Sequence, residues 1–250
     1  MSYFRTPICL GILLLSLALH AGATDVSPQA TVTVQGDLRE FFLLTDPGSD
    51  VPVGVMVLRR TAVMGGMLLE QDLCYPDGVR VFESERLRGA GRRFIWREWG
   101  HPTRTGRTWI LEGERGATNL NLMSWVGGPV QRLNLAVSDG TLFPLEALER
   151  MRSIEAGTMR LELLSPLRAC VESVTLSCKG VVPEPQNVNG PHRVLSMTNG
   201  RGEKVGQWTF AGKRLIGQRW PSGRRARIVD EERYHALFGE WSRLSVGSQP

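Results

Sequence analysis

The sequence predicts a mainly β fold: a single curved antiparallel sheet or incomplete β-barrel, with one interior helix packed on its concave face and a short C-terminal helix. Three observations lead to this prediction. Apolar and polar residues alternate along many short runs, as they do in half-buried strands. Turns rich in glycine, proline and aspartate separate these runs. One clear helical stretch interrupts the series, which indicates that a helix covers one face of the sheet.

The N-terminus has the features of a secretory signal peptide. Arg5 precedes an apolar run over 8–19, and the small residues Ala-Gly-Ala end at Ala23. The apolar run is too short to span a bilayer comfortably, which disfavours the alternative of a retained signal anchor. We therefore expect a signal peptide at 1–23 and a flexible leader at 24–38. The mature protein should be periplasmic or secreted, with no transmembrane segment.

The remainder of the chain, 39–250, is expected to form a single antiparallel β domain. A loop-like segment at 181–191 is the best candidate for a boundary, should there be one. The strands are predicted at 39–44, 51–63, 67–75, 79–87, 92–99, 107–114, 118–125, 130–137, 159–164 and 170–178, followed by a meander over 193–229.

The interior helix is predicted over 144–154. Pro144 suits the first turn, where its missing N–H costs nothing. Leu145, Leu148 and Met151 share one side and predict a helix docked on the sheet. Gly157 follows as a stop signal.

Charged pairs are predicted on the exposed side of this helix. Glu146 is spaced to pair with Arg150, and Glu149 with Arg152. A second helix is predicted from Asp230 to about Trp241, because Asp230 can cap a first turn that contains acidic residues.

The formal net charge of +5 does not predict a nucleic-acid partner. A nucleic-acid site requires basic residues gathered on one face, whereas the arginines here alternate with apolar residues and glutamates along predicted strands. An anionic membrane surface or glycan remains compatible with this charge.

Three cysteines follow the signal peptide, and an oxidising compartment favours their pairing. Cys170 and Cys178 are the disulfide candidates, close enough in sequence for a local bridge across a hairpin or bulge. Cys74 is then the odd thiol, although a bridge from Cys74 to either of the others stays open. A catalytic role for Cys74 would require an activating histidine, and the histidines stand alone in the sequence.

No enzyme motif stands out, and we predict a non-enzymatic protein without metal or cofactor. The sequence lacks GxSxG, HExxH and any Cys/His set at metal-binding spacing. Its strand carboxylates are interleaved with arginine, which fits ion pairing on a solvent face at least as well as acid/base catalysis. A hydrolase with two converging acids remains an alternative. The carboxylates concerned are Glu70, Asp72, Glu83, Glu85, Glu98, Glu112 and Glu114.

Seven tryptophans, several beside arginine, have two interpretations. They can anchor the sheet core, which large aromatic side chains commonly dominate, or they can line a ligand cavity. We favour the core for most of them.

The segment 139–157 and the strands around it carry a family resemblance. The helix in this layout follows a curved sheet and precedes a glycine and new strands, and the residues that fit it are Pro144, Leu145, Glu146, Leu148 and Arg152. In this layout the chain resembles bacterial periplasmic proteins of unknown function, whose fold is related to the lipoprotein carriers of the outer-membrane sorting pathway (LolA/LolB type). The resemblance implies a half-barrel around an apolar cavity suited to lipid or acyl chains. It supplies no catalytic residues.

The leading functional hypothesis is an exported binding protein for an apolar or amphipathic ligand, a lipid or acyl chain, in the cell envelope. The alternative is an envelope module that docks a protein partner or a glycan and has no ligand cavity. A dry cavity enclosed by the sheet would favour the first hypothesis, whereas a solid core together with a cluster of exposed tryptophans would favour the alternative. The residues expected to line the ligand are Leu135, Val137, Leu145, Leu148, Met151, Leu161, Leu163, Trp96 and Trp109.

Overall fold

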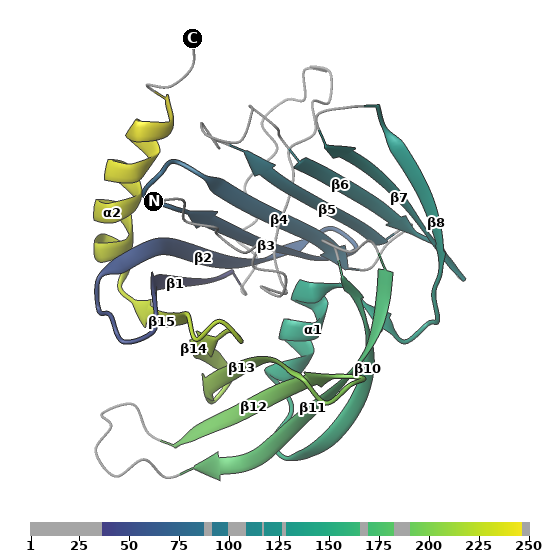
Figure 1. Cartoon of the computed structure of the whole chain (residues 1–250). Helices are drawn as coiled ribbons and strands as arrows, with labels where there is room; N and C mark the ends of the chain where they lie inside the picture. The colour runs from purple at the N-terminus through teal and green to yellow at the C-terminus, as the bar shows by residue number, and fades with distance from the viewer. Residues whose placement is uncertain are drawn as a thin grey trace.

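A computed structural model describes residues 37–87, 92–99, 109–116, 118–126, 129–165, 170–182 and 191–246. These segments form fifteen strands and two helices (Figure 1). The strands are β1 (Leu38–Thr45), β2 (Pro52–Val63), β3 (Gly66–Cys74), β4 (Arg80–Leu87), β5 (Arg92–Trp99), β6 (Trp109–Arg115), β7 (Asn119–Val126), β8 (Gln131–Ala136), β9 (Thr141–Leu142), β10 (Gly157–Ser165), β11 (Cys170–Val182), β12 (His192–Asn199), β13 (Lys204–Ala211), β14 (Arg214–Arg219) and β15 (Arg225–Val229), and the helices are α1 (Pro144–Met151) and α2 (Glu231–Val246).

All fifteen strands belong to one sheet, in the order β8-β7-β6-β5-β4-β3-β2-β1-β15-β14-β13-β12-β11-β10-β9. Two antiparallel meanders, β1–β8 and β10–β15, therefore make up the two halves of the sheet. The halves join where β1 pairs with β15, with Phe41 opposite Val229. Only β9 breaks the antiparallel pattern among the described strands, because it runs parallel to β10.

The predicted mainly β, antiparallel, open curved sheet is confirmed, and each predicted strand run overlaps an observed strand. The two-residue β9 is not anticipated by the sequence pattern. Helix α1 ends at Met151 rather than at 154. The reason is local: the N–H groups of Arg152, Ser153 and Ile154 donate to carbonyls three residues back, which tightens the last turn.

The two helices pack on opposite faces of the sheet, and β1 shows why. Phe42 and Leu44 belong to the core cluster that contains α1. Phe41 and Leu43 belong to a second cluster with Tyr234 and Trp241 of α2. A strand buried on both faces reads as a continuous apolar run, which is what the sequence has at this point.

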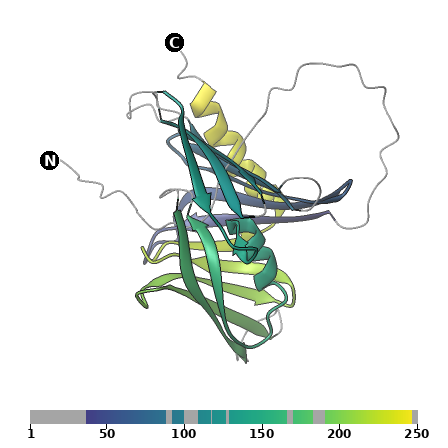
Figure 2. The same cartoon turned by 90° about the vertical axis from the view of Figure 1, so that its right-hand side faces the viewer.

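Helix α1 lies at the junction of the two halves (Figures 1 and 2). It contacts β3 and β4 of the first half and β10 of the second. Six of its eight residues are buried, including Leu145, Leu148 and Met151 of the predicted stripe. Burial on nearly every side explains how a helix too short to be stable alone in water is held.

The charged pairs predicted on α1 are half correct. Glu149 does pair with Arg152, at 3.0 Å, but Arg152 is buried rather than exposed. Glu146 does not pair with Arg150. It pairs instead with Arg92 of β5, at 3.1 Å, because Glu146 is itself buried between the helix and the sheet.

The predicted disulfide between Cys170 and Cys178 is wrong. Both residues lie on β11 and keep unbroken register with β10, from Ser165 opposite Cys170 to Gly157 opposite Cys178. Eight residues of extended strand span about 26 Å, whereas disulfide-bonded residues have Cα atoms about 4.4–6.8 Å apart. All three cysteines in the described part of the chain, including Cys74, are free thiols.

The predicted signal peptide at 1–23, most of the predicted leader and most of the loop at 181–191 lie outside the described residues. Within the described segments, neither helix combines the length and apolar character needed to cross a bilayer.

The packing of α1 gives a stability prediction. Leu148 is 4% exposed in the main core, so Leu148→Ala should lower the free energy of unfolding by about 2–5 kcal/mol. Leu133 of β8 is 39% exposed, and Leu133→Ala should cost about 1 kcal/mol or less. Urea denaturation followed by tryptophan fluorescence measures both. Equal losses in the two variants would show that α1 contributes little to the fold.

Candidate functional site

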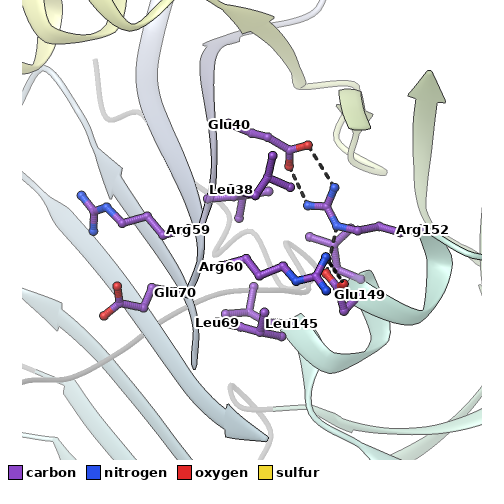
Figure 3. A pocket seen from close by; sticks show the side chains of 11 residues that line it. Leu38, Glu40, Arg59, Arg60, Leu69, Glu70, Leu145, Glu149 and Arg152 are labelled. Atoms are coloured by element: carbon purple, nitrogen blue, oxygen red, sulfur yellow. Dashed lines mark hydrogen bonds and ion pairs between the residues drawn. The ribbon is translucent and has the colours of Figure 1, made fainter. Parts of the chain in front are cut away.

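The residues predicted to line a ligand come together around α1. Seven of the nine are buried members of one core cluster, and Leu135 packs against it. The side chain of Trp109 lies outside the described residues. The clustered residues fill the space with one another. The cavity beside Leu145 and Leu148 measures about 20 Å³, room for roughly one water molecule (Figure 3).

The N-terminus of α1 is held by a carboxylate from β4. Phe143 occupies the N-cap position and offers no side-chain hydrogen bond. The backbone N–H groups of Leu145 and Glu146 instead donate to the two oxygens of Glu85, both at 2.7 Å. A carboxylate at this position also favours the helix dipole. Glu85 therefore caps a helix that lies sixty residues further along the chain.

Glu85 has an unusual protonation equilibrium. Its burial raises the pKa of the carboxyl from 4.5 to about 8, although the Leu145 N–H, the Glu83 side chain and the Glu146 N–H each oppose the shift. Glu83 lies beside Glu85 and is also fully buried. Two buried carboxyl groups in contact cannot both ionise cheaply, so the pair retains a proton at neutral pH.

Gln71 of β3 adds a third polar group to this part of the interior. It lies opposite Glu83 in the sheet register and is fully buried. Neither atom of its side-chain amide has a hydrogen-bond partner within the described residues. A buried amide without partners lowers the stability of the fold by about 1–3 kcal/mol, so this polar cluster is an energetically unfavourable part of the core.

The C-terminal end of α1 is fixed by a buried ion pair. The guanidinium of Arg152 donates to both oxygens of Glu40 on β1, at 2.9 and 2.6 Å (Figure 3). Glu40 also accepts the N–H of Leu215 on β14, at 2.9 Å, and Arg152 donates to the carbonyl of Lys213. One ion pair thus joins α1 to both halves of the sheet.

Two further arginines secure the chain on either side of α1. Arg193 of β12 donates to the carbonyls of Arg152, Ile154 and Gly212. Arg115 of β6 donates to the carbonyls of Thr141 and Ser138, just before α1. Arginine suits this role because its fork of donors can satisfy several carbonyl groups at once.

The expectation that the strand carboxylates face solvent is wrong for several of them. Glu83, Glu85 and Asp72 are all at most 2% exposed. Asp72 is neutralised by a two-fold hydrogen bond from Arg80, at 2.9 and 2.6 Å. A signal for burial was present in the sequence, because Glu83 and Glu85 share their strand face with Val81.

Four tryptophans, Trp96, Trp208, Trp220 and Trp241, are buried at 8% exposure or less, which confirms the core interpretation for them. Within the described segments, no three His, Cys, Asp or Glu side chains gather in a way that could hold a metal ion. Among the buried acids, Glu85 and Glu40 hold the two ends of α1, and Asp72 pairs with Arg80 of β4.

An open hollow of about 750 Å³ lies over the second half of the sheet. Its apolar lining residues are Met159, Leu161 and Val174, of which Leu161 and Val174 are only 7% and 2% exposed. Leu161 is the one described member of the predicted ligand-lining set found there. Met159 is 41% exposed. The remaining lining residues are Gly140, Arg150, Arg160, Glu162, Ser173, Thr175, Thr198, Asn199, Gly200 and Gly202.

The polar side of the hollow contains an organised carboxylate. Glu162 accepts hydrogen bonds from the hydroxyl groups of Ser138, at 2.6 Å, and Thr141, at 2.9 Å. These two bonds lower the pKa of Glu162 from its ordinary value, so this half-buried carboxylate stays ionised at neutral pH. The hollow therefore combines fixed charge with apolar surface.

The sequence matches no family model and no curated protein. Its fold is shared with a solved protein. That protein is a β-barrel-like protein of the domain of unknown function DUF1849 from Brucella abortus, with a TM-score of 0.55. The match covers 77% of this chain and 95% of the Brucella protein, at 11% sequence identity. The likeness is therefore one of fold, and it agrees with the predicted resemblance to bacterial proteins of unknown function.

The Glu83–Glu85 pair predicts a dependence of stability on pH. A carboxyl pKa of about 8 in the folded state, against about 4.3 when unfolded, means that only the folded chain holds this proton between those values. The stabilisation is complete below about pH 4 and is lost as pH rises to 8, at up to about 1.4 kcal/mol per pH unit.

Denaturation of the wild type and of Glu85→Gln at several pH values tests this. The wild type should lose stability relative to the variant as pH rises from 5 to 8, since groups common to both proteins cancel in the difference. Parallel stability profiles would show that Glu85 ionises normally.

The Glu40–Arg152 pair predicts strong coupling. Arg152→Met leaves a buried charge on Glu40 and should cost about 3–5 kcal/mol. Adding Glu40→Gln should restore part of this loss, since glutamine can still accept the Leu215 N–H. The exposed pair Arg93–Glu114, at 3.9 Å, is the control and should show coupling below about 1 kcal/mol. If the losses in free energy of unfolding from the two single substitutions simply add in the double variant, Glu40 and Arg152 are not coupled and the prediction is wrong.

Proposed function

We propose that this chain is an exported, non-enzymatic protein of the cell envelope that binds an amphipathic ligand, a lipid or acyl chain, in the periplasm or outside the cell. The observation that carries the proposal is the open hollow of about 750 Å³. Its volume falls in the range of about 300–1,000 Å³ that is usual for small-ligand sites. Apolar and polar residues share its lining, as an amphipathic ligand requires.

In this proposal α1 is a plug on the concave face of the sheet, and the ligand lies beside it rather than beneath it. Glu85 holds one end of α1 and Glu40 the other, through buried hydrogen bonds. The space under the helix is already filled, with a remaining cavity of about 20 Å³. Arg150, an exposed residue in the last turn of α1, reaches the hollow instead.

The expected signal peptide and the resemblance to periplasmic proteins support this proposal. A signal peptide at 1–23 would deliver the protein to the periplasm or the medium. A fold related to the LolA/LolB-type lipoprotein carriers would be suited to acyl chains. The Brucella protein adds a β-barrel-like fold of unknown function and leaves the ligand to be tested.

A second candidate is an envelope interaction module without a bound ligand. The specific observation in its favour is the end strand β8. Its side chains are largely exposed, Leu133 is 39% exposed, and Val130 just before it is 42% exposed. A sheet edge with exposed apolar residues can add a strand from a partner protein.

Delipidated protein titrated with a fluorescent fatty acyl probe tests the binding function, together with native mass spectrometry of freshly purified protein. We expect saturable binding and co-purified lipid. Ser173→Trp, which places a bulky side chain at an exposed position of the hollow, should weaken binding by about tenfold or more.

The matched control is Lys179→Trp, at an exposed position of the same strand outside the hollow, which should bind as the wild type does. Absence of both probe binding and co-purified lipid would overturn the proposed function. Equal binding by the two variants would move the site away from the hollow.

A further inference from the structure

Two arginines in the hollow have no protein partner. Arg150 and Arg160 both line it and both are exposed. Neither guanidinium makes an ion pair or a side-chain hydrogen bond within the described part of the chain, unlike Arg92, Arg115, Arg152 and Arg193 nearby. Their donors are therefore available to an anionic group of a ligand.

Glu162 offers a complementary acceptor in the same hollow. Both hydroxyl groups that bind it, from Ser138 and Thr141, donate to Oε2. The other oxygen, Oε1, is left without a donor among the described residues. Because two hydroxyl groups fix the carboxylate, Oε1 is presented with little further loss of side-chain freedom.

The cation and the anion on β10 are adjacent but not paired. Arg160 and Glu162 are two residues apart on one strand, so they share a face and their Cα atoms are about 7 Å apart. No ion pair joins them in the structure, although opposite charges at this spacing can approach. The hollow thus presents separate positive and negative groups a short distance apart.

We propose that the hollow recognises a zwitterionic head group in which a phosphate is joined by a short link to a primary ammonium, the chemistry of phosphoethanolamine. The phosphate lies against Arg150 and Arg160, and the ammonium donates to Oε1 of Glu162. The apolar chains of the same ligand lie along Met159, which is the exposed apolar side chain of the hollow. This inference rests on the proposed function, because it names the class of amphipathic ligand for that site.

The charges argue against the two nearest alternatives. A head group that is only anionic would gain from the arginines but would be repelled by the fixed carboxylate of Glu162. A quaternary ammonium has the right charge but no N–H to donate to Oε1. Of these three head groups, the primary ammonium next to a phosphate is the one that satisfies all three side chains at once.

Calorimetric titration with short-chain lipids below their micelle concentration tests the inference. Dihexanoyl lipids with phosphoethanolamine, phosphoglycerol and phosphocholine head groups share the same chains, and soluble phosphoethanolamine lacks chains. We expect the phosphoethanolamine lipid to bind about tenfold more tightly than the other two lipids, since a charge-assisted hydrogen bond contributes about that factor. The soluble head group should bind more weakly than the lipid.

Glu162→Gln is the decisive variant, because glutamine can still accept both hydroxyl groups and the fold should be retained. It should remove most of the preference for phosphoethanolamine over phosphocholine, because both cations lose the same charge attraction and only the primary ammonium also loses a hydrogen bond to a carboxylate. Arg160→Gln should weaken all three lipids. Arg227→Gln, an exposed arginine outside the hollow, should change nothing, and thermal unfolding confirms that each variant is folded.

The outcomes separate the inference from the function on which it rests. If phosphoglycerol or phosphocholine lipid binds as tightly as phosphoethanolamine lipid, the head-group proposal is overturned and the binding function stands. If no lipid binds, the proposed function falls as well. If soluble phosphoethanolamine binds as tightly as the lipid, the head-group chemistry is supported and the acyl-chain part of the proposed function is overturned.

Discussion

The position of α1 depends on two buried carboxylates. Glu85 supplies the acceptors that the first turn of the helix lacks, and Glu40 neutralises Arg152 just beyond its last turn. Both carboxylates would be costly in an apolar core without these partners. The helix and the acids therefore depend on each other. The acids accept hydrogen bonds from the helix N–H groups and from Arg152, and these donors in turn satisfy the buried carboxyl oxygens. Because Glu40 also binds β14, the same contacts hold the two halves of the sheet around the helix.

Local features of this fold were predictable from sequence, and long-range ones were not. Alternation and turn residues locate nearly all the strands, and the Leu145–Leu148–Met151 stripe locates α1. Long-range contacts have no signature in the local sequence. Examples are the pairing of β1 with β15 and the contact of Glu40 with Arg152, which are 112 residues apart. The disulfide prediction failed for a different reason. The segment between Cys170 and Cys178 contains no glycine, proline, asparagine or aspartate, which favours one straight strand over a hairpin.

The sequence predicts that a set of apolar residues converges, but it does not predict the open hollow. The apolar residues expected around a ligand do converge, yet they pack on α1 and leave almost no space. The open hollow instead combines alternate faces of β10 and β11 with the turn after β12. Such a surface mixes residues that periodicity assigns to different sides of a sheet. Sequence pattern therefore identifies an apolar interior more readily than a hollow at the margin of the sheet.

The pairing of β1 with β15 has a consequence for how the chain is made. Phe41 meets Val229 only when nearly the whole polypeptide is available. Until then one edge of β1, with its run of buried phenylalanine and leucine residues, has no neighbour. A message truncated before β15 would yield a chain whose central strand offers this apolar edge to other molecules, which invites aggregation. Completion of synthesis is thus a condition for solubility as well as for the final fold.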